Sequence, residues 1–160
     1  IDDCEIAHFY RDLYEEHCDI EGIPQVAVIR NPVDRFISAS TYFRTLYGQK
    51  VQQRMEDYDE FISIIENFHN DLDVETRNWW RPQIDYLTDE THVWKFEDGL
   101  GDDFGKWMSE KLEVPFEVDS SARYMGNKHE DLKLDKTDKL VENIRKFCSA
   151  DIEQLYPELN

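Results

Sequence analysis

The chain has 160 residues, and 36 acidic residues against 18 basic ones give it a formal net charge of −18. This length suits one domain with a true hydrophobic core, and an aromatic content of 13% argues against disorder. The acidity disfavours nucleic acid and anionic membranes as partners. The sequence contains no run of 18 apolar residues, so it predicts no membrane span.

The three cysteines have neither the spacing nor the number that metal sites and disulfide frameworks need. Cys4, Cys18 and Cys148 form no CxxC pair, and an odd count leaves one thiol unpaired. Cys4 and Cys18 could pair in a secreted protein, but free thiols in a reducing compartment are the simpler interpretation. We therefore expect no zinc site and a cytoplasmic protein, with the Golgi lumen as the alternative for a truncated eukaryotic chain.

Hydrophobic periodicity predicts helices alternating with two short strands. In chain order we expect a helix over 3–17, a strand over 25–30, a helix over 32–47, a helical core within 55–76, a helix start within 78–87, a strand over 91–96, helices over 102–112 and 135–149, and a last turn over 151–156. The stretch 55–76 holds eight acidic residues and no basic one, which is typical of a solvated helix face. The alternation predicts a single α/β domain over 1–160 with a parallel sheet.

Residues 26–38, VAVIRNPVDRFIS, carry the strongest functional signal. A β-branched strand ends at Arg30, and a helix follows with Ser38 eight residues after the arginine. Backbone N–H groups and the dipole of a helix N-terminus favour an anion there, and a guanidinium suits phosphate. From residue 25 to 54 there are five basic residues and one acidic residue, so this is the one cationic stretch of the chain. From the residues alone, a phosphate site and a purely structural role for the pair stay equally open.

The string RNPVDRFISASTYF, residues 30–43, resembles the 3′-phosphate-binding segment of sulfotransferases that use 3′-phosphoadenosine 5′-phosphosulfate (PAPS). In that family the 3′-phosphate is held by an arginine at a strand end, an acidic or amide residue, a proline, and a serine eight residues on. The matching residues here are Arg30, Asn31, Pro32 and Ser38. The resemblance implies a three-layer α/β/α sandwich of the P-loop nucleoside-triphosphate-hydrolase type, with PAPS as donor and 3′,5′-adenosine bisphosphate as product.

Further similarity points to the carbohydrate branch, especially the heparan and uronosyl 2-O-sulfotransferases. The residues that match this branch are Arg35, Tyr42, Phe43 and Arg44, followed by the segments 80–83, 96–98, 103–104 and 151–157. The resemblance implies that Arg35 helps to bind the cofactor. It also makes Arg44, Arg81 and Gln83 candidates for binding the acceptor.

His8 is the candidate general base. In the 2-O-sulfotransferases a histidine lies the same 22 residues ahead of the motif arginine and is thought to deprotonate the acceptor hydroxyl. A sugar hydroxyl is a weak acid, so its attack on sulfur benefits from a base that titrates near neutrality. The branch has a second histidine two residues earlier, where this chain has Ile6, and a packed or surface histidine stays the alternative.

The sequence has no Pro-Lys-x-Gly-[Ser/Thr]-[Ser/Thr] string, the loop whose backbone cradles the 5′-phosphosulfate in that family. In the family this loop lies several tens of residues before the arginine motif. Because the chain begins at Ile1 and not at Met, we expect the loop to precede it; a loop supplied from elsewhere and a loss of activity are the alternatives. The resemblance implies no metal, because a sulfuryl group carries less charge than a phosphoryl group. The expected activity is sulfuryl transfer from PAPS to a hydroxyl, most simply of a carbohydrate. The alternatives are a P-loop kinase-like phosphotransferase, with Glu97 and Asp98 as magnesium ligands, and a degenerate domain that binds a nucleotide or a partner without turnover.

Overall fold

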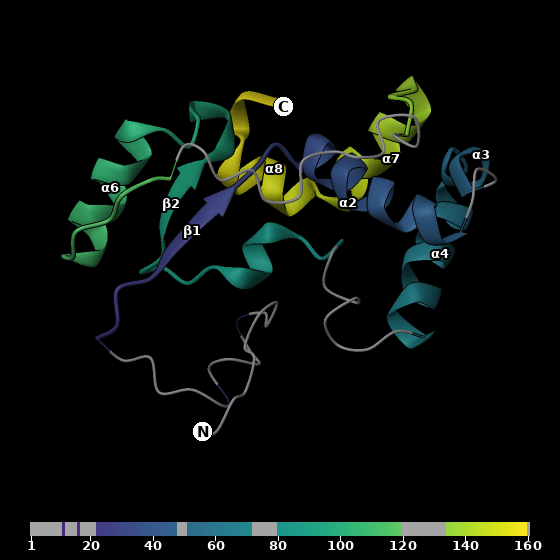
Figure 1. Cartoon of the computed structure of the whole chain (residues 1–160). Coiled ribbons are helices and arrows are strands. Elements are labelled where there is room, and N and C mark those ends of the chain that lie inside the picture. The colour runs from purple at the N-terminus through teal and green to yellow at the C-terminus, as the bar shows by residue number, and fades with distance from the viewer. Residues whose placement is uncertain are drawn as a thin grey trace.

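The structure, a computed structural model, describes Arg11, Glu16 and residues 22–47, 51–71, 80–119 and 134–159. For 42–47, 51–52 and 67–71 it describes the backbone alone. The fold mixes helices with a small parallel sheet, as Figure 1 shows. In these ranges no helix has the combination of length and apolar character that crossing a membrane requires.

Two strands form the sheet of the described chain. β1 (Val26–Ile29) pairs in parallel with β2 (His92–Lys95), and Ile29 lies opposite Lys95 at the end of the ladder. The predicted strands over 25–30 and 91–96 and their parallel pairing are therefore confirmed. The chain between the two strands supplies the long crossover that parallel pairing requires.

Each face of the strand pair is covered only in part, because Val28 and Val93 stay 45% and 42% exposed on opposite faces. On one face Ile29 packs with Leu87 and Tyr156 in a small buried cluster. On the other face the Trp94 ring lies 5.7 Å and 5.4 Å from the rings of Phe104 and Trp107. Those two rings belong to α6 (Asp102–Leu112), the helix predicted with these bounds.

The remaining helices lie mainly on one side of the sheet in Figure 1. They are α2 (Pro32–Tyr47), α3 (Val51–Met55), α4 (Tyr58–Asp71), α7 (Asp138–Phe147), α8 (Ser149–Leu155) and the short 3₁₀ helices η1 (Gln83–Tyr86), η2 (Phe96–Asp98) and η4 (Pro157–Leu159). The predicted helix over 32–47 is confirmed. Of the solvated face predicted within 55–76, the described part is confirmed by exposed Asp59, Glu60 and Glu66.

Three predictions near the other helices need correction or lie outside the described residues. The helix predicted over 135–149 begins only at Asp138, because the Thr137 hydroxyl caps it by accepting from the Leu140 N–H at 3.3 Å. A separate helix, α8, replaces the turn predicted over 151–156. The predicted helix over 3–17 lies outside the described residues except for Arg11 and Glu16.

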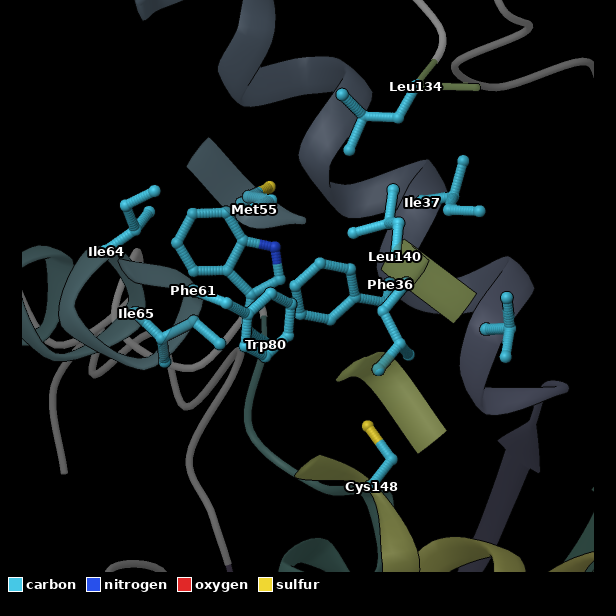
Figure 2. Packing of buried hydrophobic residues seen from close by; sticks show 12 residues of the cluster. Phe36, Ile37, Met55, Phe61, Ile64, Ile65, Trp80, Leu134, Leu140 and Cys148 are labelled. Atoms are coloured by element: carbon cyan, nitrogen blue, oxygen red, sulfur yellow. The ribbon is translucent and has the colours of Figure 1, made fainter. Parts of the chain in front are cut away.

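The main core is an aromatic stack between helices and the segment before η1. Phe36 of α2 stacks on Phe61 of α4 at 5.2 Å and on Trp80 at 5.9 Å, as Figure 2 shows. Leu140 and Ile144 of α7 are fully buried in the same cluster. Trp80 is buried in this core, and its indole N–H donates to the Ser40 hydroxyl at 3.0 Å.

Substituting Phe36→Ala removes the ring that stacks on Phe61 and Trp80 and meets Phe147 edge-on. Because the side chain is 1% exposed, we expect the free energy of unfolding to fall by about 3 to 5 kcal/mol. Phe116 is 37% exposed, so Phe116→Ala should destabilise the protein much less. Urea unfolding followed by circular dichroism measures both values, and equal losses would contradict this account of the core.

Burial raises the pKa of the Cys148 thiol from 9.0 to about 12; the charge of Asp151 adds to the shift and Arg35 opposes it. The folded thiol therefore stays protonated at pH 8.5, and iodoacetamide should modify Cys148 only after unfolding. Below pH 9 the thiol is protonated in both the folded and the unfolded state, so its contribution to the free energy of unfolding is complete. Between about pH 9 and 12 only the unfolded thiol ionises, and the free energy of unfolding should fall progressively. Mass spectrometry of the Cys148 peptide, with and without urea, provides the measurement.

Candidate functional site

The carboxyl ends of β1 and β2 bring two dipeptides together. Ile29 pairs with Lys95, so Arg30-Asn31 follows one strand beside Phe96-Glu97 after the other. The Arg30 guanidinium lies over the Phe96 ring, 4.9 Å from its centroid. The Asn31 N–H donates to Glu97 Oε1 at 2.7 Å. Carboxyl ends of parallel strands are where α/β folds place their ligands.

The N-terminus of α2 is capped by its own flanking residue. Asn31 Oδ1 accepts from the N–H groups of Val33 at 3.0 Å and Asp34 at 3.3 Å, and Pro32 has no N–H. The Arg35 N–H already donates to the Asn31 carbonyl at 2.9 Å. The expectation that these backbone N–H groups face an anion is therefore wrong. Any anion here must be bound by side chains.

Arg30 and Ser38 keep their side-chain donors available. Arg30 is half-buried, and its guanidinium forms no ion pair with any carboxylate of the described residues. Ser38 is exposed, and within the described ranges its hydroxyl makes no hydrogen bond. Ser38 lies seven residues after Asn31, so it shares the face of α2 that continues from the cap.

The other predicted arginines are placed differently. Arg35 Nη1 donates to the Arg81 carbonyl oxygen at 2.8 Å, which ties α2 to the segment before η1. Arg81 Nη1 lies 3.4 Å from Asp85 Oδ2 in a partly exposed ion pair. Arg44 lies in α2, but its side chain is outside the described part. The structure therefore links Arg35 to the segment of Arg81, while Arg30 stacks on Phe96.

Gln83 is not placed where an acceptor would reach it. Its side chain belongs to a residue that is 6% exposed, and its amide is occupied by the backbone of Arg30. Oε1 accepts from the Arg30 N–H at 2.8 Å, and Nε2 donates to the Arg30 carbonyl at 2.8 Å. Gln83 thus supports the residue that presents the guanidinium.

Asp151 of α8 is a functional candidate that sequence reasoning missed. It is fully buried, and its carboxylate accepts from the N–H groups of Gln83 and Ile84, both at 2.9 Å. Gln83 Nε2 lies 3.4 Å from Asp151 Oδ2. One aspartate among 36 acidic residues gives no sequence signal of burial. Only the fold identifies it.

Both oxygens of Glu97 are engaged. Oε1 accepts from Asn31, and Oε2 accepts from the Tyr156 hydroxyl at 3.0 Å. Burial, followed by the hydrogen bond to Glu97, raises the pKa of Tyr156 far above its ordinary value, so the phenol stays a proton donor to the carboxylate. Within the part of the chain that the structure describes, no three His, Cys, Asp or Glu side chains are grouped to hold a metal ion.

His8 lies outside the described residues, so its role as base stays a prediction. No protein-family model, curated protein or solved structure matches the chain.

Proposed function

We propose that this domain transfers a sulfuryl group from PAPS to a hydroxyl, with a carbohydrate as the acceptor. We further propose that the β1–β2 pair belongs to a three-layer α/β/α sandwich of the P-loop type. Arg30 and Ser38 bind the 3′-phosphate of the cofactor, and Arg35 supports the same helix. His8 acts as general base.

The observation that carries this proposal is the Arg30 guanidinium. In a chain of net charge −18, it stacks on Phe96 and pairs with none of the described carboxylates. A half-buried guanidinium with no counter-ion among the described residues favours an anionic ligand, because a phosphate would supply the missing charge. Ser38 follows on α2 with an available hydroxyl. The eight-residue spacing is the one that the sulfotransferase motif uses.

The chemistry requires little from the protein beyond positioning and one proton acceptor. The acceptor hydroxyl oxygen attacks sulfur, the bond from sulfur to the 5′-phosphate oxygen breaks, and 3′,5′-adenosine bisphosphate leaves. The hydroxyl proton passes to His8. Arg30 and Ser38 hold the opposite end of the nucleotide, so they contribute binding and orientation and form no bond to the reacting atoms.

The charge of the chain favours a small or weakly charged acceptor. A long sulfated glycosaminoglycan would be repelled by an acidic surface, and the one clearly cationic stretch, 25–54, is short. Arg44 and Arg81 stay the candidates for contacting a sugar, whereas Gln83 is buried against Arg30.

Two other functions would use similar architecture. A kinase-like enzyme needs free carboxylates for magnesium, and the two hydrogen bonds to Glu97 count against that residue as a ligand. A non-catalytic nucleotide-binding or partner-binding domain would keep the same Arg30 geometry. Calorimetric titration of the full-length protein with 3′,5′-adenosine bisphosphate and with ATP separates these functions. Tighter binding of ATP would favour the kinase, and binding without turnover would favour the domain that only binds.

Substituting Arg30→Ala should weaken binding of 3′,5′-adenosine bisphosphate by about 10- to 100-fold, since hydrogen bonds to charged groups contribute about 1.5 to 3 kcal/mol. Ser38→Ala should weaken it by about fivefold, because only a hydroxyl is lost. Isothermal titration calorimetry gives both dissociation constants.

Arg54→Ala is the matched control. It removes the same charge from an exposed side chain that pairs with Glu60 at 2.8 Å, so nucleotide affinity should stay unchanged. If Arg30→Ala binds as tightly as the wild type, or if all three variants lose affinity equally, the cofactor assignment is wrong.

His8→Ala should lower turnover by about 10²- to 10⁴-fold and remove the acidic limb of the pH–rate profile. The limb arises because only the neutral imidazole accepts a proton, so the wild-type rate falls as acid protonates the base. His92 is exposed on β2, and His92→Ala should keep both the rate and the limb. Unchanged turnover in His8→Ala would exclude it as the base.

A further inference from the structure

We propose that Gln83 and Asp151 are positioning residues for the anion site: together they fix the backbone of Arg30 and thereby the place of its guanidinium. The identity of the anion rests on the proposed function, whereas the positioning itself is a statement about Arg30.

The backbone N–H and C=O groups of Arg30 point away from β2. The Gln25 carbonyl accepts from the His92 N–H at 2.9 Å, so the odd-numbered residues of β1 direct their polar groups toward β2. Asn31 follows the same alternation with its N–H on Glu97. Arg30 therefore directs its N–H and C=O to the opposite edge of β1.

At that edge no neighbouring strand receives these groups within the described chain, because the sheet has two strands. The Gln83 amide takes the place of a strand. It accepts the Arg30 N–H and donates to the Arg30 C=O, each at 2.8 Å. A single planar group thus satisfies both backbone polar atoms of Arg30, whose guanidinium pairs with no carboxylate of the described residues.

Asp151 sets the orientation of that amide. Its carboxylate only accepts hydrogen bonds, so the NH₂ of Gln83 must face Oδ2 at 3.4 Å, and the carbonyl oxygen must face the Arg30 N–H. A flipped amide would place oxygen against the carboxylate and mismatch both atoms of Arg30. The Gln83 and Ile84 N–H groups hold the carboxylate itself, which is fully buried.

A fixed backbone favours anion binding because it reduces the freedom that Arg30 loses on binding. The Phe96 ring restricts the movement of the guanidinium. The two hydrogen bonds from the Gln83 amide, here called the Gln83 clamp, restrict the movement of the Arg30 main chain. Without the clamp, Arg30 would keep its charge but would reach the anion from a broader range of positions.

The experiment compares two buried amides. Gln83→Met keeps the length of the side chain and removes both hydrogen bonds to Arg30. Asn143 of α7 is also buried, and its Nδ2 donates to the Met55 carbonyl at 2.9 Å in the main core, so Asn143→Met is the matched control. Both variants should melt at a lower temperature. Only Gln83→Met should weaken binding of 3′,5′-adenosine bisphosphate, by about tenfold, measured well below both melting temperatures.

A double-mutant cycle with Arg30→Ala measures how the two substitutions couple in their effect on the dissociation constant, and general destabilisation would not produce such coupling. If Gln83 acts through Arg30, Gln83→Met should weaken binding further by less than about twofold once the guanidinium is gone. A folded Gln83→Met with wild-type affinity overturns the proposal, as does a tenfold loss that persists in the Arg30→Ala background. Should Gln83→Met fail to fold, Asp151→Asn, which keeps the volume, is judged by the same criteria.

Amide hydrogen exchange separates this proposal from the proposed function. In the wild type the Arg30 N–H should be protected, and in Gln83→Met its exchange should speed up by at least about tenfold while the Ile29 N–H stays protected. A wild type that does not bind 3′,5′-adenosine bisphosphate contradicts the function, and unchanged exchange at Arg30 contradicts the clamp.

Discussion

The buried carboxylate of Asp151 is the constraint on which the arrangement around the strand ends depends. A carboxylate removed from water requires hydrogen-bond donors, and here the donors are two backbone N–H groups of η1 and the amide of Gln83. Satisfying them brings α8 against η1 and places the Gln83 amide at the edge of β1. The backbone of Arg30 is therefore held by a hydrogen-bond network that ends at the carboxylate of Asp151 in α8.

The two buried clusters are stabilised in different ways, the larger one by apolar packing and the smaller one together with neighbouring hydrogen bonds. The larger cluster, around Phe36, joins α2, α4 and α7 through apolar and aromatic contacts that tolerate a range of side chains. The smaller cluster, around Ile29, contains few apolar residues and lies beside the Asp151 network. Stability thus depends mainly on the first cluster. Precision at the strand ends depends on the second, where hydrogen bonds specify direction as well as proximity.

Sequence reasoning found the local features and missed the long-range ones. The β-branched run before Arg30 and the Pro-initiated helix after it are written in neighbouring residues, so β1 and α2 were predictable. Asn31 as a cap was also within reach, because an Asn-Pro pair before a helix is a common start. The roles of Gln83 and Asp151 were not predictable, since each depends on a partner brought near by the fold. Gln83 was accordingly assigned to an acceptor instead of to Arg30.

The distances along the chain that these hydrogen bonds span have a consequence for the order of folding. Arg30 and Gln83 are 53 residues apart, and Gln83 and Asp151 are 68 apart, whereas the Asn31 cap joins residues two and three apart. Closing long loops is entropically unfavourable until other contacts offset it, so the cap and α2 can form early while the clamp waits for α8. A chain that emerges residue by residue can therefore form the capped helix before it can form the hydrogen bonds that fix the backbone of Arg30.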